Sequence, residues 1–205
     1  MVRAVIGSLT RVVIYISAFL IGAVLMGFEM LGSRYLYPYF GGGIGTWAGL
    51  ISMVLVALTI GYFAGGNIVD RYPSAFVIAV ATGIAALYLA AVPATADGLM
   101  MGILNSMGDG PYAILAAAAA LILVPVSLLG MLSPVCVRLL IRTTEQTGRT
   151  SGLIYGISTI GNVFGTLFTT FTLIPWIGSR AITYVFCGVL IVCALSLFAV
   201  SRQQP

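Results

Sequence analysis

The chain has 205 residues, of which 60% are hydrophobic and only 7% are charged, and its mean hydropathy is +1.14. Soluble globular domains carry roughly 25% charged residues, so this composition excludes a soluble enzyme, a disordered chain and a disulfide scaffold. The formal net charge is +4, but the arginines are scattered at the ends of apolar runs, which excludes a nucleic-acid-binding surface. The composition predicts an all-α integral membrane protein whose residues 1–205 form one polytopic domain.

Two missing residue types narrow the chemistry. The sequence has no histidine, which excludes histidine acid–base relays and metal or haem ligation by histidine. It has no lysine, which excludes a Schiff base. Cys136, Cys187 and Cys193 form no CxxC pair, so we expect them to be small buried apolar residues. We predict no cofactor, no metal site and no catalytic residue, and a membrane enzyme is the least favoured function.

Six apolar stretches are long enough to cross a bilayer, which takes about 20 residues each. We place them at about 10–36, 44–69, 75–92, 112–132, 151–176 and 181–201. Three spans precede the connection at 97–109 and three follow it, and the two triplets begin on opposite sides. This pattern predicts a 3+3 inverted repeat. The connection itself is either a short interfacial helix on the outer leaflet or an unstructured loop.

The arginines predict how the spans are oriented. With the N-terminus inside, the cytoplasmic side holds Arg3, Arg11, Arg71, Arg138, Arg142, Arg149 and Arg202. The outer side holds only Arg34 and Arg180. This positive-inside bias predicts a multi-pass protein of the bacterial inner membrane with both termini in the cytoplasm.

Glu29 is the only carboxylate well inside an apolar span, where burying a charge is costly. One interpretation is a structural ion pair with Arg34 or Arg180 that ties the first span to the outer connections. The other is a counter-ion for a cationic ligand, or a proton site. We therefore name Glu29 and Arg34 as candidate substrate-binding residues.

The fifth span has a polar face formed by Ser158, Gly161, Asn162, Gly165, Thr166 and Thr169. Gly161 and Gly165 have the GxxxG spacing that allows close helix packing, as do Gly152 and Gly156. The face either packs tightly on another helix or lines a solute cavity. Ser158, Asn162 and Thr166 are candidate substrate-binding residues, and Gly161 and Gly165 are candidate structural or gating residues.

Two further groups lie at the cytoplasmic ends of spans. Gly66, Asp70 and Arg71 end the second span, where a carboxylate can hold a neighbouring helix end. With Pro134, which interrupts the end of the fourth span, they are predicted to be structural or gating residues.

Two blocks of residues carry a family resemblance. The first block consists of Glu29, Arg34, Pro38, Gly41, Trp47, Gly65, Gly66, Asp70 and Arg71. The second consists of Gly130, Pro134, Arg138, Leu139 and the runs 152–166 and 173–180. Together they resemble the integral membrane domain of the bacterial spermidine synthase-like proteins, described as fused transporter and spermidine synthase, over about residues 12–200. The segment Gly66 to Arg71 is also similar to the loop signature of major facilitator transporters.

The resemblance implies a fold like half of a major facilitator transporter and a role near polyamine metabolism. In the fused proteins an aminopropyltransferase domain follows the membrane part, and this sequence contains no such domain. One expectation is a non-catalytic membrane module that anchors or serves a separate cytoplasmic aminopropyltransferase-like partner, with Arg138, Arg142 and Arg149 as the docking surface. A second is a small homodimeric transporter of a polyamine or another small solute. A third is a structural subunit of a larger membrane complex. In each case the bilayer is a partner and nucleic acid is not.

Overall fold

The chain folds as a bundle of helices in the computed structural model, which describes residues 7–141 and 147–202. Six apolar helical segments are long enough to cross a membrane: Leu9–Phe40, Ile44–Arg71, Ala75–Met107, Pro111–Leu140, Thr147–Trp176 and Ser179–Ser201. The uninterrupted ones are α1 (Ser8–Phe40), α2 (Ile44–Arg71), α3 (Ala75–Met107) and α9 (Ser179–Ser201). The described residues contain no strand. The predicted all-α architecture with six membrane-crossing helices is confirmed, and it indicates a multi-pass membrane protein.

The fourth and fifth segments each contain a π-helical turn. The fourth consists of α4 (Pro111–Ala118), η1 (Ala119–Leu123), α5 (Val124–Gly130) and α6 (Leu132–Leu140). The fifth consists of α7 (Thr147–Phe168), η3 (Thr169–Leu173) and α8 (Ile174–Trp176). Each π-turn ends two residues before a proline, Pro125 or Pro175. A proline has no amide hydrogen, and a wider turn is one way in which a membrane helix adjusts to that loss.

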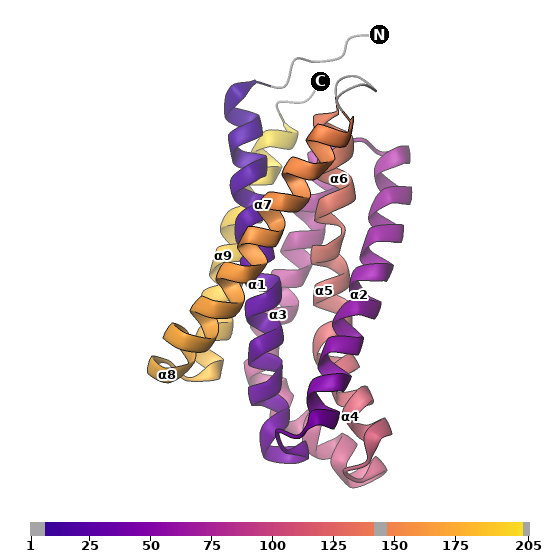
Figure 1. Ribbon diagram of the computed structural model, residues 1–205, viewed down its shortest axis with the longest axis vertical. Coiled ribbons are helices and arrows are strands. Elements are labelled where there is room, and N and C mark those ends of the chain that lie inside the picture. The colour runs from indigo at the N-terminus through magenta and orange to yellow at the C-terminus, as the bar shows by residue number, and fades with distance from the viewer. Residues whose placement is uncertain (1–6, 142–146, 203–205) are drawn as a thin grey trace.

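The helices run up and down the long axis of the bundle (Figure 1). We call the end where α1 begins and α9 ends the terminal end. The opposite end, where residues 108–110 join α3 to α4, is the hairpin end. Gly41 and Gly108 end α1 and α3 there with φ of 71° and 75°, a conformation that residues with a β-carbon rarely adopt.

Five helix pairings organise the bundle. The fourth segment packs on α2 and α3, α7 packs on α1, and α9 packs on α3 and α1. In Figure 1, α2 and α5 lie to the right of α1 and α9 lies to the left, while α7 crosses in front of α1. The helix α1 therefore lies at the centre, between both sides.

The third helix is longer than the predicted span of 75–92. It continues through Pro93 to Met107, so the stretch after 97 is neither a separate interfacial helix nor an unstructured loop. Pro93 is buried inside the helix. A membrane helix tolerates a proline because neighbouring groups can satisfy the backbone that it leaves unpaired. The first and fourth segments also run past the predicted limits of 36 and 132, to Phe40 and Leu140.

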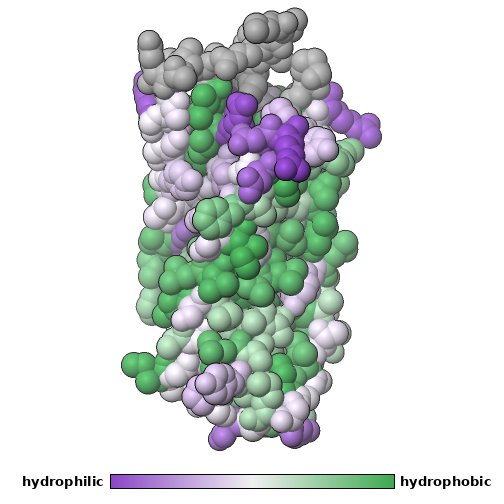
Figure 2. All heavy atoms as spheres, turned by 90° about the vertical axis from the view of Figure 1, so that its right-hand side faces the viewer, coloured by the Kyte–Doolittle hydropathy of each residue, from purple (hydrophilic) through white to green (hydrophobic). Residues whose placement is uncertain are grey.

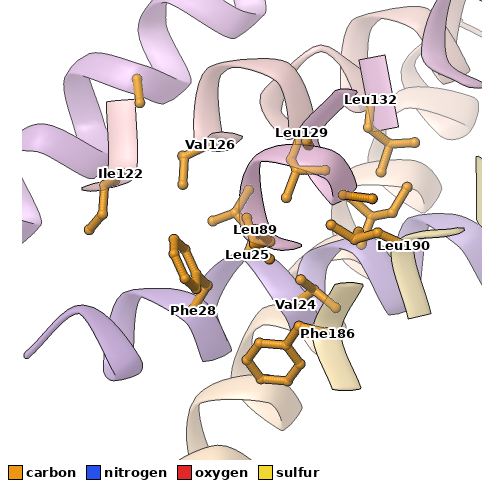
Figure 3. Close-up of a cluster of buried hydrophobic side chains, with 14 of the residues drawn as sticks. Val24, Leu25, Phe28, Leu89, Ile122, Val126, Leu129, Leu132, Phe186 and Leu190 are labelled. Carbon is orange, nitrogen blue, oxygen red and sulfur yellow. The ribbon is translucent and has the colours of Figure 1, made fainter. Parts of the chain in front are cut away.

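Apolar side chains fill the space between the helices. Figure 3 shows Val24, Leu25 and Phe28 of α1 with Leu89, Ile122, Val126, Leu129, Leu132, Phe186 and Leu190 from the surrounding helices. Lipid tails are as apolar as these side chains, so close van der Waals packing, more than removal from water, stabilises such a core.

The surface fits a bilayer. Figure 2 shows a broad hydrophobic band with hydrophilic side chains gathered toward the two ends of the bundle. Large apolar side chains such as Phe63, Leu87 and Phe171 are 71% exposed. In water such a surface would favour association, whereas in a membrane it faces lipid.

Candidate functional site

Glu29 lies in the interior of the bundle without a partner. Its exposed fraction is 6%, and no described residue forms a hydrogen bond or an ion pair with it. The predicted structural ion pair is wrong for both candidates. Arg180 instead forms an ion pair with Asp97 of α3, and Arg34 has no described ion-pair partner. Buried charges in membrane helices usually pair with one another, so an unpaired carboxylate is a candidate functional group.

Two cavities lie on either side of Glu29 along α1. The central cavity, of about 30 Å³, has room for about two water-sized molecules. It is lined by Ile21, Gly22, Leu25, Leu58, Tyr62, Leu129, Gly130, Leu132, Ser133, Ser158 and Asn162. The hairpin-side cavity, of about 280 Å³, is lined by Met30, Ser33, Arg34, Tyr37, Gly42, Thr46, Trp47, Thr170 and Ile174.

The helical repeat places Glu29 between these cavities. Leu25 lines the central cavity and Ser33 lines the hairpin-side cavity. Glu29 is four residues from each, and residues four apart share one face of a helix. Glu29 therefore lies on α1 between the residues that line the two cavities, although it is not itself a lining residue of either.

The polar face of the fifth segment lies partly on this path. Ser158 and Asn162 line the central cavity, and the side-chain oxygen of Asn162 is buried without a hydrogen bond. Thr166 lines neither cavity, and its hydroxyl donates to the Asn162 carbonyl at 2.9 Å. The structure thus brings two of the three candidate polar residues of this segment to the cavity.

Glycines in two helices allow their partners to approach closely. A β-carbon on Gly161 or Gly165 of α7 would lie less than 3.0 Å from the backbone of α1, at Phe19 or Ala23. Gly152 and Gly156 share the GxxxG spacing, but a β-carbon added to either of them would meet no atom of another helix within 4 Å.

The second helix repeats this arrangement. A β-carbon on Gly61 or Gly65 would lie less than 3.0 Å from the backbone of Ser127 or Met131 in the fourth segment. Gly66, by contrast, has no neighbour within 4 Å. Close packing therefore belongs to Gly61 and Gly65 in α2, as it does to Gly161 and Gly165 in α7.

Ion pairs join helices at both ends of the bundle. Arg138 Nε of α6 lies 3.3 Å from Asp70 Oδ1 at the end of α2, and both side chains are largely exposed. Asp70 therefore contacts an arginine of the fourth segment, where the sequence suggested a helix end. Arg71 and Arg149 are exposed, Pro134 is half-buried in α6, and Arg142 lies outside the described residues.

The two π-turns differ in how their polar groups are satisfied. In a π-turn, the carbonyl of one residue accepts a hydrogen bond from the amide of the residue five positions later. For Ala120 that residue is Pro125, which has no amide hydrogen to donate. The Tyr88 hydroxyl of α3 donates to the Ala120 carbonyl in its place. Pro175 stands at the same distance from Thr170, and no described side chain donates to that carbonyl.

Two hydroxyls of η3 are also unpaired. Thr169 and Thr170 have buried hydroxyl oxygens without a hydrogen-bond partner in the structure. Thr170 lines the hairpin-side cavity. The wall that η3 contributes to this cavity therefore keeps hydrogen-bonding capacity free for a ligand.

Sequence reasoning did not identify most of the hairpin-side cavity. Ser33, Thr46, Trp47 and Thr170 come from three separate segments, and no local pattern connects them. Pro175 was the one sequence signal that pointed to Thr170, because a proline leaves a carbonyl about one helical turn before it without its usual donor. Thr46 also closes the α1–α2 turn, since its hydroxyl donates to the Gly41 carbonyl at 2.9 Å.

The cysteines behave as expected. All three are free and buried. The Cys187 thiol contacts the Ala86 carbonyl at 3.3 Å and so helps to join α9 to α3.

Comparison with protein families, with curated proteins and with solved structures finds no match to this chain.

Proposed function

We propose that this chain is a membrane carrier module that binds a small solute bearing a cationic group. Its proposed path runs along α1 between the central cavity and the hairpin-side cavity, past Glu29. The observation that carries the proposal is the carboxylate of Glu29, which is 6% exposed, has no described partner and lies between two cavities. An unpaired buried carboxylate is expensive in a membrane unless it acts on a proton, an ion or a cationic ligand.

The helix pairing supports two inverted repeats of three helices each. In such a repeat the first segment corresponds to the fourth, the second to the fifth and the third to the sixth. This correspondence exchanges the pair α1–α7 with the pair formed by the fourth segment and α2, and it keeps the pair α3–α9. It also matches Gly61 and Gly65 with Gly161 and Gly165, which make equivalent close contacts.

The central cavity supports the same symmetry. Under the proposed repeat, Gly22 of the first segment corresponds to Gly130 of the fourth, and both line this cavity. Tyr62 of the second segment corresponds in the same way to Asn162 of the fifth, and both of these also line it. The cavity therefore lies where the proposed pseudo-twofold axis passes. Carriers built from inverted repeats commonly bind their solutes at such an interface, near the middle of the membrane.

The arginines support a cytoplasmic terminal end. Of the described arginines, Arg71, Arg138, Arg149 and Arg202 are exposed at the terminal end. Arg34 and Arg180 belong to the other half of the bundle, so the positive-inside rule favours termini in the cytoplasm of a bacterial cell. The hairpin-side cavity then opens toward the outside.

Counterflow into proteoliposomes tests the carrier function. Vesicles loaded with unlabelled solute should accumulate labelled putrescine or labelled 4-aminobutyrate from the medium. Glu29→Gln removes the charge at nearly constant shape, so we expect at least a tenfold loss of accumulation with normal yield and folding. Asp109→Asn alters an exposed acid at the hairpin end and should leave accumulation unchanged. Absence of counterflow by the unaltered protein, or equal counterflow by Glu29→Gln, would overturn the proposal.

A second candidate function is a membrane anchor for a soluble aminopropyltransferase-like partner. The observation in its favour is that Arg138 and Arg149 are exposed at the terminal end. Native mass spectrometry after mild solubilisation should then show a stoichiometric partner with aminopropyltransferase activity. Replacing Arg138 and Arg149 by Ala should release it. A homodimer without such a partner would leave the carrier as the better account.

A further inference from the structure

The hairpin-side cavity has the positive Arg34 in its wall, and the negative Glu29 is next to lining residues of α1 without lining the cavity itself. Arg34 lines the cavity and has no described ion-pair or hydrogen-bond partner. Glu29 directly precedes Met30 and is one turn from Ser33, and both of these residues line the cavity. The five residues from Glu29 to Arg34 correspond to about 7.5 Å along the helix. Around the helix the two residues are about 140° apart, with the cavity-lining Met30 and Ser33 between them. Glu29 and Arg34 therefore flank the part of α1 that faces the cavity and do not pair with each other.

The two groups recognise opposite charges. A guanidinium binds a carboxylate with two parallel hydrogen bonds and keeps its charge at every physiological pH. A carboxylate buried away from water favours a ligand ammonium group. A simple polycation would meet repulsion from Arg34, and a simple anion would meet repulsion from Glu29.

The rest of the cavity favours a small ligand with a short apolar chain. Its volume of about 280 Å³ is at the lower limit of typical ligand sites. Tyr37 and Trp47 provide aromatic surface, and Thr170 provides an unpaired hydroxyl.

We infer that the hairpin-side cavity binds a small zwitterion, of the size of an amino acid, with its ammonium group toward Glu29 and its carboxylate on Arg34. This inference rests on the proposed carrier function and names its substrate class. The ligand would balance both protein charges, so the occupied site would be neutral overall. Such a neutral site is less costly in a membrane than either charge alone.

Binding to the purified full chain in mild detergent tests the inference. Calorimetry would use alanine and 4-aminobutyrate as zwitterions, putrescine as a dication and butyrate as an anion. We expect the zwitterions to bind at least tenfold more tightly than putrescine or butyrate. Arg34→Gln should weaken zwitterion binding at least tenfold and narrow the preference over putrescine. Arg34→Lys keeps the charge and should recover part of the affinity.

Arg180→Gln provides a matched control. Arg180 is also exposed in the same half of the bundle but is already paired with Asp97, so its loss should leave binding unchanged. Putrescine binding that exceeds zwitterion binding and survives Arg34→Gln would overturn the inference and leave the carrier proposal standing. Failure of every ligand to bind, together with absence of counterflow, would overturn both.

Discussion

The pair formed by α2 and the fourth segment packs in the same way as the pair formed by α7 and α1. The two pairs differ in how many of their polar groups have a hydrogen-bond or ion-pair partner. Gly61 and Gly65 close the first pair, and Gly161 and Gly165 close the second. In the first pair, Asp70 meets Arg138, and Tyr88 satisfies the carbonyl that the π-turn leaves open. Beside the second pair, Glu29 and the hydroxyls of Thr169 and Thr170 have no partner.

This difference separates structure from function within one bundle. Buried polar groups in folded proteins are almost always paired, so a site that leaves several unpaired has another use for them. The α2 side is the better satisfied of the two, because Asp70 and the Ala120 carbonyl have partners and the Ser127 hydroxyl is the buried side-chain oxygen of this pair that lacks one among the described residues. The α1–α7 side has more unpaired hydrogen-bonding groups, as the proposed solute path requires.

The largest expected effect tests whether the two pairs really pack alike. Gly61→Ala and Gly165→Ala should each destabilise the protein by about 1–3 kcal/mol, because the new methyl group would overlap backbone atoms. Unfolding in mild detergent, followed by circular dichroism during titration with SDS, measures both. Gly66→Ala and Gly156→Ala are matched controls with open space around them and should be neutral or slightly stabilising. A loss confined to one pair would break the comparison.

A smaller effect tests the difference between the π-turns. Tyr88→Phe should cost about 1 kcal/mol, because it leaves the Ala120 carbonyl without its donor. Thr170→Val should leave stability within about 0.5 kcal/mol, because its hydroxyl has no partner to lose. The same detergent titration compares them. Equal losses would show that both π-turns are satisfied and that η3 has no free polar group.

The smallest effect concerns the ion pair on the α2 side. Asp70→Asn and Arg138→Gln should each change stability by less than about 1 kcal/mol, because exposed ion pairs contribute little and salt screens them. A double-mutant cycle at low and high salt measures the coupling. A coupling above about 2 kcal/mol that persists in high salt would mean that the pair fastens α2 to α6 far more strongly than its exposure indicates.

The sequence predicts the architecture well because apolar length is a strong signal. Each of the six helices appears where an apolar run stands, and the inward position of Ser158 and Asn162 follows from the 3.6-residue period. The ends of the helices were less predictable. The third span was predicted to end at 92, whereas α3 passes through the buried Pro93 and continues to Met107.

Partners across the bundle could not be read from the sequence. Arg180 pairs with Asp97, and Asp70 pairs with Arg138, because helix packing decides which distant residues meet. The hairpin-side cavity was missed for the same reason, since α1, α2 and η3 each supply only part of its wall. Glu29 was identifiable because a lone acid in an apolar run needs no partner to be noticed.

The unequal lengths of α3 and α9 predict sensitivity to hydrophobic mismatch. α9 has 23 residues, about 35 Å, which nearly matches a hydrocarbon layer of about 30 Å, whereas α3 has 33 residues, about 50 Å. Asp97 meets Arg180 at the start of α9, and the ten residues of α3 that follow extend about 15 Å further. A thicker bilayer would therefore draw this ion pair toward hydrocarbon while the tip of α3 stays in water. Membrane thickness would act first on the start of α9, beside the segment that carries Thr170.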